Sequence, residues 1–232
     1  LDLINPVDEQ VYATAASGTE QDVDRAVSAA HSQLYGGAWS KLNGTHRAAL
    51  LNNLAALVER DLEILADMDA RAIGRSRMEP RMMDVPNAVA HLRAAAGWAN
   101  QLEGRTIPSG GYMGVRTLSY TVREPVGVVA AIVPWNFPLM IGAWKIAPAL
   151  AAGNSVVLKP SEKSPLTALR LAELALAAGI PPGVFNVVPG FGPEAGSPLA
   201  LHMDVDCIAF TGSTRVGKQI HVMAGQSNLK RA

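Results

Sequence analysis

Charged residues, aromatic residues and cysteine are all scarce in this chain. Only 17% of its 232 residues are charged, and the acidic and basic side chains balance, so no net field attracts nucleic acid or an anionic membrane. The single cysteine, Cys207, excludes an internal disulfide and is typical of a reducing compartment. The apolar content of 49% is sufficient for a substantial core. Together these features predict a globular protein of the cytoplasm without nucleic-acid or membrane partners.

Three further signals are missing. Residues 1–6 lack the basic and then apolar order of a signal peptide. The longest apolar stretch is interrupted by Pro134, Asn136, Pro138 and Lys145, so no segment is predicted to span a bilayer. The five histidines show no metal-ligand spacing, and no metal site is predicted.

Residues 1–103 are predicted to be mainly helical. Apolar residues recur at helical spacing after Thr19, whose distance in sequence from Asp22 is that of a capping box. Gly74 is a residue type that commonly ends a helix. The expected helices cover residues 19–30, 46–59, 61–72 and 87–102.

Residues 104–125 differ from the sequence on either side. Glycine and proline punctuate the segment, and residues 115–122 have a high strand propensity. This pattern predicts a hairpin of two short strands, for which an ordinary surface hairpin is the plain interpretation.

From Val126 to the end of the sequence, short apolar runs alternate with helical patterns. The expected strands are residues 126–133, 155–159, 184–188 and 206–210, and each is followed by a helix. This alternation predicts an α/β fold with a Rossmann-like parallel sheet and helices on both faces. Residues 126–232 are therefore expected to form a nucleotide-binding core.

The segment Pro134-Trp135-Asn136-Phe137-Pro138 follows the first of these strands. Its two prolines restrict the backbone, and open α/β sheets bind ligands at the carboxyl ends of their strands. The Asn136 amide can donate a hydrogen bond to a developing oxyanion. The alternative is a turn asparagine that bonds its own backbone.

Two other loops at the carboxyl ends of strands carry polar residues or glycine. Lys159 and Glu162 can hydrogen-bond a ribose, or they form only a solvated ion pair. Gly192 and Gly196 permit a close approach of the backbone to a ligand, or only a tight connection from strand to helix.

The segment from Gly212 to Gly217 separates the last strand from its helix. The free amides and the positive end of the helix dipole favour a bound anion there, and the alternative is a capped helix start without a ligand. The three-glycine dinucleotide fingerprint is absent, so the motif alone does not predict a standard Rossmann dehydrogenase.

Five motifs, in this order and spacing, resemble the aldehyde dehydrogenase superfamily over essentially the whole chain. They are Pro134–Pro138, Trp144-Lys145, Lys159–Glu162, Pro182–Asn186 and Phe210–Thr214. The resemblance implies an NAD(P)-dependent oxidoreductase that converts an aldehyde into a carboxylic acid through a cysteine thiohemiacetal. It also implies that the hairpin 104–125 is an oligomerisation arm and that the protein is a homo-oligomer.

The same resemblance implies which residues form the site. Asn136 would stabilise the oxyanion, and Glu162 would repel a 2′-phosphate, which favours NAD, with NADP as the alternative. Lys145 matches a position near a buried water path, where a proton relay and a snorkelling lysine are the two interpretations. The implied cofactor site comprises Val133, Pro134, Trp135, Asn136, Lys159, Ser161, Glu162, Gly192, Gly196, Gly212, Ser213 and Val216.

The resemblance further implies that the 232 residues correspond to about the first half of a family member. The family's nucleophilic cysteine, general-base glutamate and catalytic domain have no counterpart, so a truncated chain that is inactive alone is expected. Cys207 lies inside a predicted strand and is expected to be a small buried residue rather than a nucleophile. The alternative function is a non-catalytic NAD-binding or assembly module.

Overall fold

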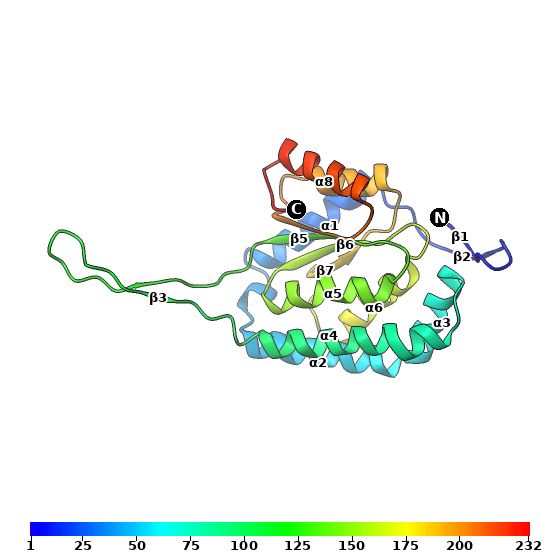
Figure 1. Ribbon diagram of the computed structural model, residues 1–232, viewed down its shortest axis with the longest axis horizontal. Coiled ribbons are helices and arrows are strands. Elements are labelled where there is room, and N and C mark those ends of the chain that lie inside the picture. Colours follow the sequence, from blue (N-terminus) through cyan, green and yellow to red (C-terminus); the bar gives the residue numbers. More distant parts are fainter.

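The computed structural model describes residues 1–232 and is built around a parallel sheet of four strands (Figure 1). The strands are β5 (Val128–Ile132), β6 (Ser155–Lys159), β7 (Phe185–Val187) and β8 (Cys207–Phe210), in the order β7-β6-β5-β8. Each lies within one of the four predicted strands, and β6 has the predicted ends. The prediction of a parallel α/β fold is confirmed.

Alternate residues of β5 pack on opposite faces of the sheet. Val128, Ala130 and Ile132 belong to one apolar cluster, whereas Val129 and Ala131 belong to the other. Successive side chains of a strand point to opposite faces, and a strand covered on both faces is apolar throughout. This double burial explains the unbroken apolar run in the sequence.

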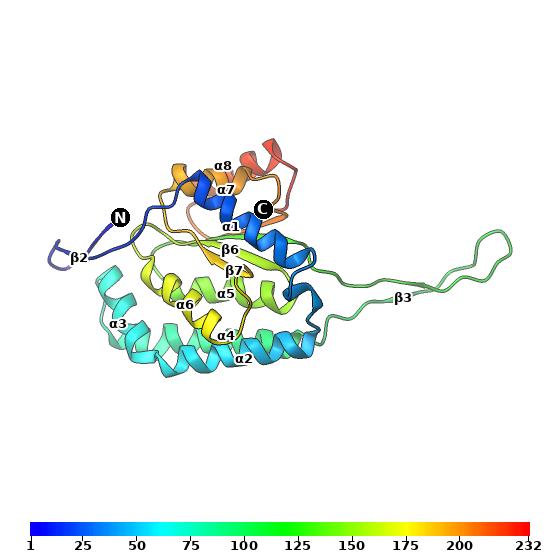
Figure 2. The same ribbon diagram turned by 180° about the vertical axis from the view of Figure 1, so that it is seen from behind.

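Helices cover both faces of the sheet, as Figures 1 and 2 show from opposite sides. One face is covered by α1 (Glu20–Leu34), α7 (Ser197–Leu201) and α8 (Thr214–Gln226). The other face is covered by α5 (Pro138–Ala151) and α6 (Leu166–Ala177). The fold therefore has the two helical layers that the sequence predicts.

A further helical layer packs outside α5 and α6 (Figure 1). It comprises α2 (Gly44–Arg60), α3 (Leu62–Ile73) and α4 (Val85–Trp98), close to the predicted helices, with a π-helical turn η2 (Pro80–Asp84) before α4. Helix α3 ends at Gly74, whose φ of 68° is left-handed and favours glycine. None of the helices has both the length and the apolar character needed to cross a bilayer.

The amino-terminal third is mainly helical but also contains two short strands that the sequence did not predict. Strands β1 (Asp2–Ile4) and β2 (Val11–Thr14) form an antiparallel hairpin, and a short 3₁₀ turn η1 (Trp39–Lys41) follows α1. Asn5 starts the turn between the strands, since its side chain accepts a hydrogen bond from the Val7 N–H at 3.0 Å. Strands this short carry too few residues for an alternating pattern to be recognised.

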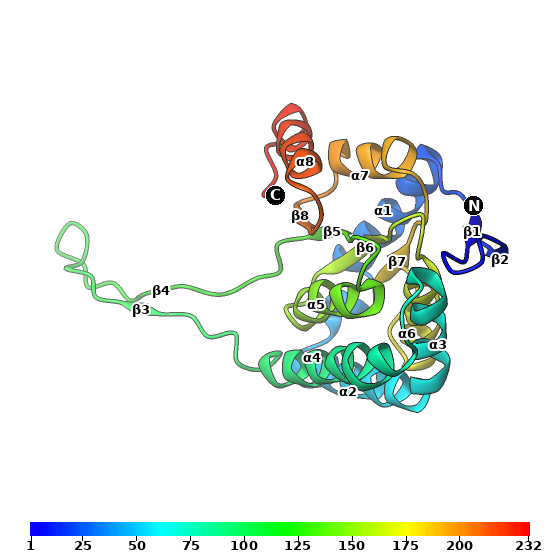
Figure 3. The same ribbon diagram turned by 45° about the vertical axis from the view of Figure 1, so that its right-hand side comes forward.

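Residues 104–125 leave the body of the molecule as a long arm (Figure 3). Within it β3 (Thr106–Ile107) pairs with β4 (Ser119–Tyr120), and Tyr112 forms a single antiparallel bridge with Val115 near the tip. Of the strand-prone residues 115–122, only Ser119 and Tyr120 form a strand, because an isolated two-stranded ribbon offers neither a third strand nor a core to stabilise it.

The helix predicted to follow the third strand of the sheet is divided into two elements. A π-helical turn η3 (Gly192–Gly196) comes first, and α7 begins at Ser197. Pro198, in the middle of this segment, lacks the backbone N–H that a continuous α-helix requires, and Gly196 further weakens such a helix.

Leu158 in β6 tests how far stability depends on the sheet core. Its side chain is completely buried, so Leu158→Ala is expected to lower the free energy of unfolding by about 2–5 kcal/mol. Leu176, on α6, is 53% exposed, and Leu176→Ala is the matched control with an expected change below about 0.5 kcal/mol. Urea unfolding followed by circular dichroism measures both, and equal losses would contradict the buried position of β6.

Candidate functional site

The loops that follow β5, β6, β7 and β8 meet at one edge of the sheet because all four strands are parallel. The chain adds β6 and β7 on one side of β5 and then returns to place β8 on the other side. The strand order therefore reverses between β5 and β8, and open α/β sheets bind ligands at such a point. The residues predicted for the site lie in these loops, at the end of β6 or in the first turns of the helical segments that follow the strands.

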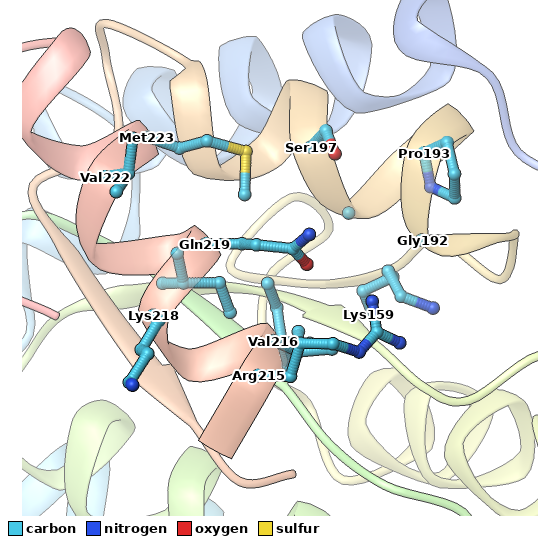
Figure 4. A pocket seen from close by; sticks show the side chains of 13 residues that line it. Lys159, Gly192, Pro193, Ser197, Arg215, Val216, Lys218, Gln219, Val222 and Met223 are labelled. Atoms are coloured by element: carbon cyan, nitrogen blue, oxygen red, sulfur yellow. The ribbon is translucent and has the colours of Figure 1, made fainter. Parts of the chain in front are cut away.

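A cavity of about 700 Å³ lies between α8 and the segment formed by η3 and the start of α7 (Figure 4). Small-molecule sites typically have volumes of about 300–1,000 Å³. The cavity brings together four of the predicted residues, Lys159, Gly192, Gly196 and Val216.

Lys159 ends β6, and its amine links two loops. Its Nζ donates hydrogen bonds to the carbonyl oxygens of Pro160 at 2.6 Å and Gly190 at 2.7 Å. Burial lowers the pKa of Lys159, and the charge of Glu162 acts in the opposite direction. A Cβ on Gly196 would lie 3.4 Å from Lys159 Cδ, so the backbone of η3 approaches this side chain closely.

Glu162 and Trp135 line a second cavity, of about 760 Å³, rather than the first. The Ser164 hydroxyl donates to the Trp135 carbonyl oxygen at 3.2 Å, which connects the loops after β6 and β5. Ser161 is buried, and its hydroxyl accepts a hydrogen bond from the Lys163 N–H at 3.3 Å. These residues therefore lie beside the first cavity and not within it.

The turn after β8 is shaped by the ring of Phe210. A Cβ on Gly212 would lie 2.5 Å from Phe210 Cζ, and one on Gly217 would lie 3.3 Å from Cε1. Ser213 is the N-cap of α8, because its Oγ accepts a hydrogen bond from the Val216 N–H at 3.3 Å. The hydroxyl thus caps the helix, while the first amides of α8 and its positive dipole end lie at the edge of the cavity.

Asn136 is half-buried between β5 and α5. Its side chain forms no hydrogen bond with another residue, so the amide is not used in a turn of its own. Six predicted residues, Val133, Pro134, Asn136, Ser161, Gly212 and Ser213, line neither of the two cavities.

Sequence reasoning missed most of the wall that α8 provides. Gln219, Ile220 and Met223 line the cavity together with Val216. Their spacing of three and four residues places them on one face of a helix. This spacing is present in the sequence, but a motif that ends at Gly217 does not include it.

The first cavity has a positive lining. Arg215, Lys218 and Lys159 contribute cationic groups, and no acidic residue lines it. Cations beside a helix N-terminus suit a phosphate, and the apolar residues of α8 suit a flat ring. No group of three or more His, Cys, Asp or Glu side chains is placed to hold a metal ion.

Lys145 and Cys207 are both half-buried and lie outside the two cavities. Burial lowers the pKa of Lys145. Burial raises the pKa of the Cys207 thiol, although the charge of Arg231 acts in the opposite direction. A thiol with a raised pKa carries little thiolate at neutral pH, so Cys207 is a weak nucleophile.

The family model described as "Aldehyde dehydrogenase family" matches residues 1–232. Aldehyde dehydrogenase 1A1 of Mus musculus is 48% identical over 230 residues, which cover 99% of this chain and 45% of that protein. The mitochondrial aldehyde dehydrogenase of Homo sapiens is 48% identical over 229 residues, which cover 98% of this chain and 44% of that protein. The chain spans about half the length of these curated relatives.

A solved structure of an aldehyde dehydrogenase from Bacillus cereus, in complex with NAD⁺, has the same fold. It superposes with a TM-score of 0.94 at 43% sequence identity, and the match covers 99% of this chain and 46% of that one.

Gly212 tests the role of the Phe210 ring in shaping the turn. Gly212→Ala puts a Cβ against that ring, so the free energy of unfolding is expected to fall by about 1–3 kcal/mol. Gly225, near the end of α8, has no atom within 4 Å of the place that a Cβ would occupy, and Gly225→Ala should raise the free energy of unfolding by less than about 1 kcal/mol. Urea unfolding measures both variants, and a stable Gly212→Ala chain would contradict the close packing.

Proposed function

The chain belongs to the aldehyde dehydrogenase family, and we propose that it supplies the NAD-binding half of an enzyme that oxidises an aldehyde to a carboxylic acid. The observation that carries this proposal is the positively lined cavity at the carboxyl edge of the sheet, between η3 and α8. Its volume, its cations and its apolar wall fit the adenosine and phosphate groups of a dinucleotide. The B. cereus relative was solved with NAD⁺, which supports the same cofactor here.

Each part of the cavity has a proposed role in holding NAD. Val216 and the apolar face of α8 would contact the adenine, and Lys159 with Glu162 would hold the adenosine ribose. Arg215 and the first amides of α8, after Gly212 and Ser213, would hold the pyrophosphate. Gly192 and Gly196, at the two ends of η3, would let the cofactor approach the backbone closely.

The remaining predicted residues are proposed to border the reacting end of the cofactor or to support the loops around it. Bound NAD supplies the hydride acceptor. The segment from Val133 to Trp135 would border the nicotinamide half, and Ser161 would support the loop that carries Glu162. The Asn136 amide would donate a hydrogen bond to the carbonyl oxygen as negative charge develops on it. The attacking thiolate and the general base are expected outside these 232 residues, so the chain alone is proposed to be inactive.

Gly192 offers a direct test of NAD binding. No atom lies within 4 Å of a Cβ at this position, so Gly192→Leu should fold and place its side chain in the cavity. We expect calorimetric titration to show NAD binding to the unmodified chain and at least a tenfold weaker affinity in the variant. Gly97, on α4, is equally open, and Gly97→Leu is the control that should keep its affinity.

Two outcomes of this titration would count against the proposal, namely no binding of NAD, and equal binding by Gly192→Leu and the unmodified chain. In a separate activity assay with NAD and aldehydes, turnover by the chain alone would contradict the proposed inactivity. Titration with NADP decides between the two dinucleotides, and the carboxylate of Glu162 favours a higher affinity for NAD, since it repels a 2′-phosphate.

An assembly role for the arm is a second candidate function, supported by its exposed apolar side chains. Tyr112, Met113, Val115, Leu118, Tyr120 and Val122 are all at least 65% exposed. Such a series of apolar residues on a projecting ribbon is typical of a protein interface. We propose that residues 104–125 join copies of the chain in a homo-oligomer, and that a module without catalysis could retain this role.

Leu118, 78% exposed on the arm, tests the assembly role. Leu118→Asp places a charge in the proposed interface, which is costly to desolvate, so the oligomer should dissociate towards the 24.4 kDa chain. Leu176→Asp, on α6, is the control and should leave the assembly unchanged. Size-exclusion chromatography with light scattering measures the masses, and an unmodified chain that is already monomeric would exclude the assembly role.

A further inference from the structure

We propose that Asp69 and Arg75 are positioning residues for Asn136 and act through the first turn of α5. The inference rests on the proposed role of Asn136 as an oxyanion donor. The proposed positioning itself depends on contacts between segments that are distant in sequence.

Helix α5 lacks a cap of its own. Phe137 is its N-cap residue and provides no side-chain hydrogen bond, and Pro138 at the first helical position has no N–H. The first amide that needs a partner therefore belongs to Leu139, three residues after Asn136. A capping group must come from another part of the chain.

Asp69, near the end of α3, lies at this position. Its side chain is fully buried, and its Oδ1 accepts a hydrogen bond from the Thr167 hydroxyl of α6 at 2.9 Å. Its other oxygen, Oδ2, has no hydrogen-bond partner in the protein, and the nearby backbone amide of Leu139 lowers the pKa of Asp69. A negative charge beside the N-terminus of a helix is favourable, so Asp69 acts on α5 as an electrostatic cap provided by another helix.

Arg75 holds the residue that follows Asn136. Its guanidinium carbon lies 4.9 Å from the centre of the Phe137 ring, which is a cation–π contact. The same guanidinium forms an ion pair with the buried carboxylate of Asp84 in η2, and it lies 3.9 Å from Glu79. Phe137 is thereby fixed against a cation that is itself fixed by Asp84.

These contacts restrain Asn136 on its carboxyl-terminal side. Arg75, just after the end of α3, contacts Phe137, and Asp69 of α3 acts on Leu139, while Val133 continues directly from β5 on the other side. A short loop fixed at both ends keeps its amide oriented before the substrate arrives, and such preorganisation is the source of oxyanion stabilisation.

The ionisation of Asp69 gives the proposal a measurable signal. Burial raises the pKa of Asp69 to about 7, although Thr167, Arg75 and the Leu139 amide act in the opposite direction. The other titratable groups around it are Tyr12 of β2, whose pKa is raised by burial and by Asp69, and Asp84 beyond Arg75. Protonation of Asp69 removes the charge that caps α5, so the cap weakens as the pH falls through about 7.

Nuclear magnetic resonance of the whole chain tests the proposal without any need for catalysis. The side-chain amide of Asn136 is assigned by its loss in Asn136→Ser. We expect its chemical shift to change with pH at the same midpoint as the Asp69 carboxyl carbon. We expect Asp69→Asn to abolish this change and Arg75→Met to displace the Asn136 signals at every pH.

Asp61→Asn is the matched control. Asp61 is also buried and also joins the start of α3 to α6, through Arg170 Nη2 at 2.5 Å, but it lies at the other end of α3 from Arg75. This variant should leave the Asn136 signals and their pH dependence unchanged. An Asn136 amide that does not follow Asp69 in the unmodified chain overturns the proposal even if no variant folds.

Identical effects of Asp61→Asn and Asp69→Asn on residues 135–139 would also overturn it, since both would then act only through general destabilisation. The NAD titration is independent of this coupling. A chain that fails to bind NAD but shows the coupling refutes the proposed function and leaves the cap of α5 in place, and the reverse result refutes only the positioning role.

Discussion

Parallel pairing of β5 with a strand on each side is the interaction on which the rest of this structure depends. Strand β6 bonds one edge of β5 and β8 bonds the other, so the strand order reverses at β5 and four loops meet at one edge of the sheet. Residues of β5 belong to both apolar clusters, so this strand also joins the two helical layers. This strand therefore gives the loops a rigid frame.

Buried polar side chains then fix the loops relative to one another. Lys159 holds the loop after β7, Ser164 holds the loop after β5, and Asp69 reaches the start of α5 from α3. Each of these polar groups is desolvated on folding, and its burial costs free energy unless a partner compensates. Such groups therefore favour one arrangement of the loops over looser alternatives.

The parallel sheet and most helices could be predicted from the sequence because their burial repeats along the chain. Strand β6 is buried at every position, so its apolar run coincides with the strand. Strands β1 and β2 have mostly exposed residues and hence no such run. In the site, short sequence motifs predicted Lys159 and Val216. The electrostatic cap of α5 instead relates residues 69 and 139, which are too far apart in the sequence for any local motif to connect them.

The arm has a consequence for the connectivity of the molecule. It is inserted between α4 and β5, yet the body packs α2 and α4 directly against α5, so the core does not need the arm to stay together. A protease that cuts at the highly exposed Met113 would leave two peptides that share one apolar core. They would separate on a denaturing gel but migrate together under native conditions. A clipped preparation of this protein would therefore look intact in native size-exclusion chromatography.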